Sequence, residues 1–213
     1  MIVVAVAGWI VYVLVALLLR TLIQLRQTGS SGFVGVRSGA SVIERIAGVM
    51  LAGAFVLSLA APFVGAPLAS TAIAGAVIVV IATAGTFAAQ LAMSRSWRIG
   101  VDPHERTELV TRGAFALVRN PIFSWMIVAI VGIALACPTP LALVAPVLLI
   151  VGLQIQVRVV EEPYLVRTHG ETYAAYARRT GRFVPGIGKL TRRSSSAAAA
   201  PHRVAATARR GLL

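Results

Sequence analysis

Long uncharged stretches alternate with short polar segments along the chain. No Asp, Glu, Lys or Arg occurs in residues 1–19, 46–94 or 120–157. A helix needs about 20 apolar residues to cross the hydrocarbon core of a bilayer, so the first stretch predicts one membrane helix and the second predicts two. The third stretch, of 38 residues, predicts two short passes or one bent hairpin.

Proline and glycine mark the expected reversals between these helices. Pro62, Gly65 and Pro67 divide the second stretch, and the run Cys137-Pro138-Thr139-Pro140 divides the third. The pattern therefore predicts an all-α, polytopic membrane protein with five transmembrane helices, of which the last two form a short hairpin followed by an interfacial C-terminal segment. The predicted helices cover residues 2–19, 47–64, 68–93, 122–136 and 141–157.

Composition predicts three parts. Residues 1–93 hold the first three helices and a Gly- and Ser-rich, flexible loop at 20–45. Residues 94–188 hold the hairpin and its polar flanks, where the informative residues gather. Residues 189–213 are rich in Ser, Ala and Arg and predict a disordered basic tail.

The charges predict the orientation of the protein. Only 13% of the residues are charged, about half the fraction of a soluble domain, and the formal net charge is +13. Every charge falls in 20–45, 94–119 or from 158 onward, segments that five passes place on one side. The positive-inside rule makes that side cytoplasmic and the N-terminus external. The membrane that we expect to hold the protein is the cell (inner) membrane. The alternative for the first stretch, a cleaved signal peptide, lacks a basic region before it.

Several function classes find no support in the sequence. The basic residues border predicted membrane helices instead of accompanying aromatic platforms, which argues against a nucleic-acid partner. There is no zinc-type Cys/His cluster, no glycine-rich phosphate loop and no nucleophile elbow, and no metal is predicted. The single cysteine, Cys137, cannot form an intrachain disulfide.

The predicted hairpin brings its two polar flanks together. Arg119-Asn120-Pro121 precedes it, with Pro121 well placed as the first residue of a helix, and Arg158, Glu161 and Glu162 follow it. Carboxylates at the level of the lipid headgroups are costly unless they are paired or functional. Two interpretations stay open here: a ligand site, or an Arg158–Glu162 ion pair at i,i+4 spacing.

Pro163 predicts that the chain breaks at Glu162 and restarts as an amphipathic helix along the membrane surface. In that helix Leu165, His169, Tyr173 and Tyr176 would share one stripe. Gly170 interrupts the stripe and predicts a kink or a close approach of another backbone.

The motifs in residues 95–188 are similar to those of the isoprenylcysteine carboxyl methyltransferase family, whose relatives include phospholipid N-methyltransferases and, more distantly, the C-terminal part of sterol reductases. The resemblance rests on Leu109-Val110-Thr111-Arg112-Gly113-Ala114-Phe115, on Arg119-Asn120-Pro121-Ile122-Phe123, and on Glu161-Glu162 followed by Leu165, Gly170, Tyr173, Tyr176 and Pro185.

This resemblance implies S-adenosylmethionine as the cofactor, bound at the cytoplasmic side. It implies a substrate-side role for Arg158 and a cofactor-holding role for Glu162, and these two are the candidate catalytic residues. The candidate cofactor-binding residues are Leu109, Val110, Phe115, Arg119, Asn120, Pro121, Phe123, Glu161, Glu162, Tyr173 and Tyr176. The carboxyl methyltransferases commonly have histidine at the positions of Thr107-Glu108 and Asn120, although bacterial relatives often have Asn at the second position. The resemblance therefore does not imply the same substrate for this chain.

The sequence therefore predicts an integral membrane, S-adenosylmethionine-dependent methyltransferase of bacterial appearance, acting on a lipophilic acceptor embedded in the membrane. A carboxylate acceptor needs no base, whereas an amine or hydroxyl needs one such as Glu161, Glu108 or His104. The alternatives are a sterol-reductase-like, nicotinamide-dependent membrane reductase and a non-catalytic membrane scaffold. The oligomeric state stays open.

Overall fold

The computed structural model describes residues 1–32, 40–97 and 109–191, and this part of the chain is helical apart from its turns and one isolated bridge, Val118 to Gly181. The α-helices are α1 (Ile2–Val13), α2 (Arg20–Thr28), α3 (Val42–Ala60), α4 (Ala72–Met93), α5 (Ala114–Leu117), α6 (Pro121–Ala136), α7 (Val144–Ile155) and α8 (Glu162–Arg179). Short 3-10 turns, η2 (Ala61–Phe63) and η3 (Ser94–Ser96), follow α3 and α4.

Two π-helical segments join neighbouring helices without a break. Segment η1 (Leu14–Leu19) connects α1 to α2, and η4 (Gln156–Glu161) connects α7 to α8. The first helix therefore runs over 27 residues, from Ile2 to Thr28, and the last over 36 residues, from Val144 to Arg179. Short π-helical stretches inside α-helices are frequent at functional sites.

Four of the described helical stretches are long and apolar enough to cross a membrane: Ile2–Thr28, Val42–Phe63, Ala72–Met93 and Val144–Arg179. Helix α6 is apolar but has only 16 residues, about 24 Å at 1.5 Å per residue. The all-helical membrane architecture is confirmed to that extent. The fifth pass stays a prediction, because α6 is shorter than the roughly 30 Å hydrocarbon core.

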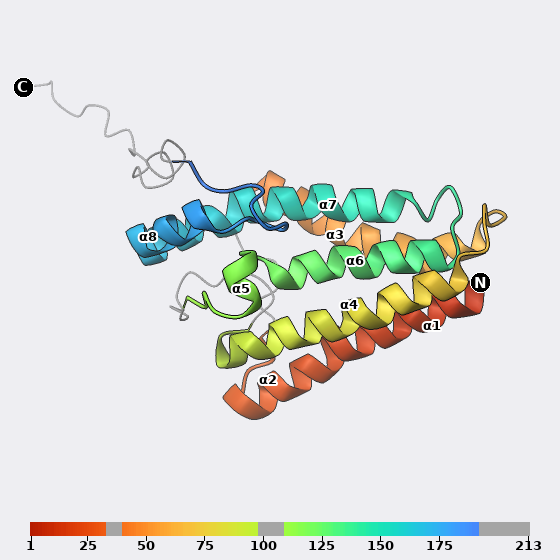
Figure 1. Ribbon diagram of the computed structural model, residues 1–213, viewed down its shortest axis with the longest axis horizontal. Helices are drawn as coiled ribbons and strands as arrows, with labels where there is room; N and C mark the ends of the chain where they lie inside the picture. Colours follow the sequence, from red (N-terminus) through yellow and green to blue (C-terminus); the bar gives the residue numbers. More distant parts are fainter. Residues whose placement is uncertain (33–39, 98–108, 192–213) are drawn as a thin grey trace, which may run out of the picture.

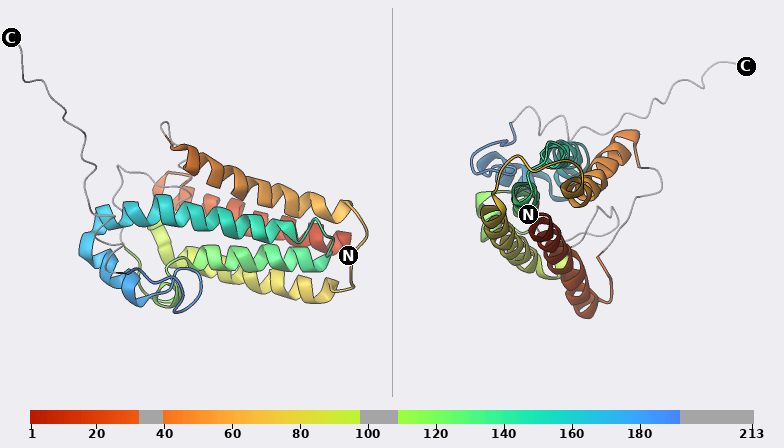
Figure 2. Two further views of the ribbon diagram at one scale, coloured as in Figure 1. Left: turned by 90° about the horizontal axis from the view of Figure 1, so that it is seen from above. Right: turned by 90° about the vertical axis from the view of Figure 1, so that its right-hand side faces the viewer.

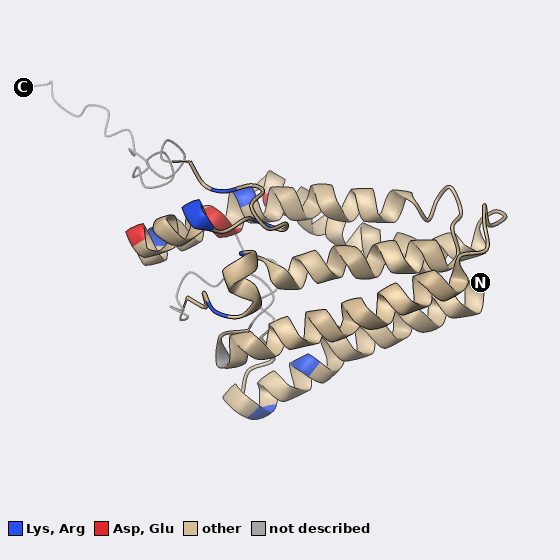
Figure 3. Ribbon diagram, viewed as in Figure 1, with Lys and Arg blue, Asp and Glu red and all other residues tan. Residues whose placement is uncertain are grey.

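The long helices lie roughly side by side as a bundle (Figures 1 and 2). Helix α6 packs against α4 and α7, α3 packs mainly against α7, and α1 lies against α4 and α6. The charged residues that Figure 3 marks gather at one end of the bundle, which we call the charged end. The reversals at residues 64–71 and 137–143 lie at the opposite end, near the N-terminus.

Small residues set the distance between α4 and α6. A Cβ atom added to Gly75 would lie 2.4 Å from the backbone nitrogen of Ala136, and one added to Gly85 would lie 2.4 Å from the ring of Trp125. Gly132 on α6 is also confined, since a Cβ atom there would lie 2.8 Å from Ile78 and 2.9 Å from Val79. Close approach of this kind provides the van der Waals packing that associates helices in a membrane, where the hydrophobic effect between them is absent.

The reversals at the uncharged end are held by side-chain hydrogen bonds. The Thr139 hydroxyl donates to the Ala61 carbonyl at 3.1 Å and accepts from the Ala142 amide at 3.1 Å. Cys137 is a buried free thiol, as a single cysteine requires. The hairpin predicted from residues 120–157 therefore has an ordered turn at this end.

Two sequence predictions change in the structure, and a third is confirmed. The chain does not break at Glu162, because η4 precedes Pro163 and the wider π-helical turn gives the proline ring room that an α-helical turn denies it. The bend comes at Gly170 (φ 56°, ψ −134°), which confirms the predicted kink there. The loop expected over 20–45 is shorter, since α2 reaches Thr28 and Ser41 begins α3 with a capping box to Glu44.

Other predictions lie outside the described residues. They concern the middle of that loop, residues 33–39, the candidate bases His104 and Glu108, and residues 192–213 of the expected tail.

Candidate functional site

A buried carboxylate, Glu162, joins two arginines at the charged end. Its Oε1 accepts from Arg119 Nη2 at 2.5 Å and from Arg182 Nε at 2.7 Å, while its Oε2 accepts from Arg182 Nη2 at 2.8 Å. The Glu162 side chain is 7% exposed and that of Arg119 only 1%. We call these three residues the Arg-Glu-Arg cluster. Charge-assisted bonds of this geometry are the strong ones among protein hydrogen bonds.

Arg119 also fixes the backbone that follows α8. Its Nη1 donates to the carbonyls of Ala177 at 3.0 Å and Thr180 at 2.5 Å, and its Nη2 donates to that of Gly188 at 3.0 Å. Its Nε finds no partner among the described residues although it is buried. Arg119 therefore holds the site together and keeps one donor unused.

Arg182 reaches Glu162 because residues 180–190 fold back along the start of α6. The Arg119 amide donates to the Gly181 carbonyl at 2.8 Å, and the Asn120 amide donates to the Arg182 carbonyl at 3.1 Å. Gly181 is required here, since a Cβ atom would lie 2.0 Å from the Val184 carbonyl oxygen. The two strand-like segments thereby place Arg119 and Arg182 beside the same carboxylate.

Asn120 and Ser124 complete this junction. The Asn120 side-chain amide donates to the Arg182 carbonyl at 3.3 Å, and the Ser124 hydroxyl donates to the Phe183 carbonyl at 2.7 Å. Pro121 is the first residue of α6, as predicted. Asn120 carries no proton-accepting nitrogen, so in this structure it positions the backbone of residues 182–183.

Aromatic side chains lie next to the Arg-Glu-Arg cluster, where Tyr173 interacts with both Arg119 and Glu162. Tyr173 and Tyr176 are buried on α8 with ring centroids 6.1 Å apart in an edge-on arrangement, and Leu109 packs against them. The Tyr176 hydroxyl donates to the Phe115 carbonyl at 2.5 Å, which ties α5 to α8. The site thus combines cationic donors, a carboxylate and an apolar aromatic wall.

The structure brings most of the predicted site residues to this place. Arg119, Asn120, Glu162 and the two tyrosines with Leu109 and Phe115 form one contiguous set. Val110 is half-buried beside Leu109 in the sequence, and Phe123 packs instead against the main hydrophobic core. Glu161 is half-buried and shares a side-chain hydrogen bond with Gln156.

Arg158 does not join the cluster. It is exposed, and the ion pairs described for Glu162 are those to Arg119 and Arg182. Of the two interpretations left open by the sequence, the Arg158–Glu162 ion pair is therefore wrong, while the substrate-side role of Arg158 stays a prediction. The physical reason is η4: its π-helical turn puts more than four residues in one turn, so the i,i+4 spacing no longer sets the two side chains on one face.

Arg182 was missed in the sequence as a site residue. Its signal was a lone arginine between Gly181 and Phe183, shortly before Pro185 and the glycines of the segment. A long cationic side chain in a stretch of small, turn-forming residues has few local partners, which favours a distant carboxylate. No spacing rule linked it to Glu162.

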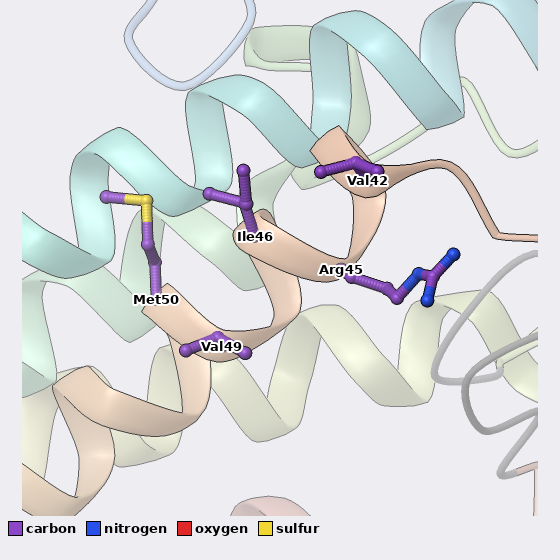
Figure 4. Close-up of a pocket in the computed structure, with 5 residues that line it drawn as sticks. All are labelled: Val42, Arg45, Ile46, Val49 and Met50. Carbon is purple, nitrogen blue, oxygen red and sulfur yellow. The ribbon is translucent and has the colours of Figure 1, made fainter.

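A shallow groove of about 290 Å³ lies elsewhere, on α3. Val42, Ile46, Val49 and Met50 line it, and Arg45 stands at its edge (Figure 4). It contains none of the residues of the Arg-Glu-Arg cluster. Its lining is that of a lipid-facing helix surface, and we assign the chemistry to the cluster.

The cluster carries a formal charge of +1, from two guanidiniums and one carboxylate, and it retains polar capacity. Arg119 Nε is an unused donor, and Glu162 Oε2 accepts one described hydrogen bond where it can accept two. A zwitterion with an ammonium, a carboxylate and an aromatic base matches this set beside the tyrosine wall, and S-adenosylmethionine is such a molecule. Among the described residues there is no group of three or more His, Cys, Asp or Glu that could hold a metal ion.

Comparison with known families bears on the class of protein. Residues 70–172 match the family model of phospholipid methyltransferases, which confirms the resemblance to integral membrane methyltransferases. The matched stretch includes Arg119 and Glu162, whereas Arg182 lies beyond it. Membership in the isoprenylcysteine carboxyl methyltransferase branch of that superfamily stays a prediction. No curated protein matches the chain.

Proposed function

We propose that the chain is an S-adenosylmethionine-dependent methyltransferase acting on a lipid acceptor within the membrane, because residues 70–172 match the family model of phospholipid methyltransferases. The observation that supports this most is the Arg-Glu-Arg cluster, whose two innermost members, Arg119 and Glu162, lie within the matched residues. A buried charged cluster beside an aromatic wall is expensive to maintain in an apolar bundle, so a ligand-binding role is the expectation.

Different residues would contact different parts of the cofactor. Arg119 Nε would donate to its carboxylate, and Glu162 Oε2 would accept from its ammonium. Tyr173, Tyr176 and Leu109 would contact its purine ring. Arg182 would act as a positioning residue, because it orients the Glu162 carboxylate from the opposite side.

When bound, S-adenosylmethionine supplies a methyl group on a positively charged sulfur. The protein's own task is to align the acceptor with that group and to exclude water, so positioning accounts for most of the acceleration. An amine of a lipid headgroup must lose a proton before it can react. Glu161, half-buried next to Glu162, is the described candidate for that base. A carboxylate acceptor would need no such group.

The proposal also sets the orientation. The charged end, with the cluster, would face the cytoplasm of the inner membrane, where S-adenosylmethionine is made, and the uncharged reversals would face outward. A lipid acceptor would then enter the site sideways from the bilayer.

Calorimetry on the purified protein in detergent tests the cofactor. We expect S-adenosylmethionine or its demethylated product to bind at micromolar concentration and Glu162→Ala to abolish binding. Glu171→Ala is the matched control, because Glu171 lies on the same helix but is exposed and pairs with Arg178. The control should bind like the wild type.

Absence of binding to well-folded wild-type protein would refute the proposal. Binding of a reduced nicotinamide in its place would favour the reductase alternative, and binding of neither would favour a membrane scaffold. The acceptor class follows from transfer of a radiolabelled methyl group into extracted lipids, with Glu162→Ala as the blank.

A further inference from the structure

A ladder of buried polar groups runs along the contact between the first helix and α4. The Tyr12 and Thr86 hydroxyls lie 3.4 Å apart. One turn nearer the charged end, Gln90 Nε2 donates to the Ala16 carbonyl at 2.8 Å. One turn further, Arg20 Nη2 donates to the Ser94 carbonyl at 2.6 Å. The ladder ends at Arg20, immediately after η1.

Arg20 is an unusual residue for this position. It is 0% exposed, its guanidinium lies 4.5 Å from the centre of the Trp97 ring, and its Nη2 also donates to Gln24 Oε1 at 2.9 Å. Its Nε and Nη1 are buried without a hydrogen-bond partner among the described residues. Those two nitrogens carry three N–H groups, more than half of the donors of a guanidinium.

The described ion pairs do not neutralise this cation. They involve Arg119, Arg178 and Arg182, and none reaches Arg20. A carbonyl and an amide oxygen satisfy part of its hydrogen bonding and the Trp97 ring faces its charge, but no carboxylate among the described residues pairs with it. Burying a charge without a counter-ion is costly, and an ionisable residue buried in a membrane helix is by default a candidate functional residue.

The surroundings of Arg20 indicate which anion. It follows 19 uncharged residues, which places it at the depth of the lipid headgroups. Leu18, Leu19 and Leu22, adjacent on the same helix, are exposed and would contact acyl chains. A phosphate attached to acyl chains therefore fits both the guanidinium and the leucine surface, and guanidinium is the side chain best suited to phosphate.

We propose that Arg20 binds the phosphate of a phospholipid at the charged end of the contact between the first helix and α4. One part of this inference rests on the proposed function: only if the protein is a lipid methyltransferase is the bound lipid the methyl acceptor, or a lipid about to enter the site. Because Arg20 is covered, the phosphate reaches it only when covering side chains move. Trp97 lies against the guanidinium and reports that movement.

The test uses the full chain in detergent and follows tryptophan emission. The chain has three tryptophans, so the difference between wild type and Trp97→Phe isolates the signal of Trp97. The ligands are dihexanoylphosphatidylethanolamine, dihexanoylglycerol, which lacks the phosphate, and inorganic phosphate. We expect a saturable change with the phospholipid alone, and Arg20→Gln should weaken its binding about tenfold or more.

Arg26→Gln is the matched control, because it removes the same charge from the same helix at an exposed position and should leave the affinity unchanged. If Arg20→Gln does not fold, Arg20→Lys takes its place, and the loss of the planar donors should still lower the affinity several-fold. An equal response to dihexanoylglycerol, or wild-type affinity in the Arg20 variants, would overturn the proposal. Saturation by inorganic phosphate at the same concentration would overturn the assignment to a lipid.

Cofactor calorimetry separates this inference from the proposed function. Arg20→Gln should bind S-adenosylmethionine like the wild type, because Arg20 is not part of the Arg-Glu-Arg cluster. If the wild type binds the phospholipid through Arg20 but no cofactor, the methyltransferase proposal fails and the phosphate site stands.

Discussion

Glu162 and Arg182, twenty residues apart in the sequence, meet side-on, with Arg182 Nε and Nη2 each bonded to a different carboxylate oxygen. This pair closes the segment after α8 onto the helix that it has just left. Arg119 joins the pair from the start of α6, 43 residues before Glu162. The site is therefore assembled from three stretches of chain, and its parts support one another.

Replacement of Arg182 by Lys should weaken cofactor binding about tenfold, because an ammonium cannot form the two parallel bonds to Glu162. Calorimetry with S-adenosylmethionine measures the change. Arg178→Lys is the control, since the Arg178–Glu171 pair is largely exposed and contributes little. Wild-type affinity in Arg182→Lys would show that Arg182 does not position Glu162 for binding.

Substitution Glu162→Gln should lower the free energy of unfolding by about 3–5 kcal/mol, because it leaves two buried guanidiniums without a carboxylate. Adding Arg182→Met should recover part of this loss, since the cluster returns from a charge of +2 to +1. Thermal unfolding of the single and double variants in detergent gives the coupling energy. Simple additivity of the two losses would contradict the ion-pair description.

The contact between α4 and α6 gives a prediction independent of the site. Gly75→Ala should destabilise the protein by about 1–3 kcal/mol, because the new methyl group would overlap the Ala136 backbone. Gly48→Ala on α3 is the control: nothing lies within 4 Å of the added atom, so the change should be neutral or stabilising by up to about 1 kcal/mol. Thermal unfolding midpoints of the two variants should therefore move in different directions or by clearly different amounts.

Gly170 should be needed for its backbone conformation alone. Its φ of 56° with ψ of −134° is strained for any residue with a Cβ atom, yet no atom lies within 4 Å of the position. Gly170→Ala should cost about 1–3 kcal/mol and also weaken cofactor binding, because Tyr173 and Tyr176 follow the kink. Gly29→Ala, at φ 75° after α2, should lower stability without changing cofactor affinity.

The sequence predicted where the helices lie better than where each helix ends. Uncharged runs and the residues that end them identify helices well, because bilayer thickness and the cost of buried charge act on every residue in the same way. Helix ends were less accurate. Arg20 looked like the start of a polar loop, whereas the structure keeps it inside a helix that runs to Thr28, with partners at Ser94, directly after α4, and at Trp97.

The candidate site was predicted where local rules apply and missed where they do not. Arg119 and Glu162 could be brought together from the hairpin, because a hairpin returns its two ends to one level of the membrane. Arg182 could not, because its approach depends on a backbone pairing between Val118 and Gly181 that no periodicity encodes. Arg158 was misplaced for a related reason: helical spacing rules assume an α-helical turn, and that turn is π-helical.

Arg20 and Glu162, the first residues after η1 and η4, both depend on the wider π-helical turn before them. A π-helical segment turns the chain less per residue than an α-helix does, so the same six residues wound as an α-helix would rotate all that follows by about one residue, roughly 100°. Arg20 or Glu162 would then point away from its partners with every side chain still present. Deleting one residue from 14–19 or 156–161 would instead be absorbed by a return to α-helical winding, which keeps Arg20 and Glu162 on the same face. The wider turns are therefore as much a determinant of the two sites as residue identity.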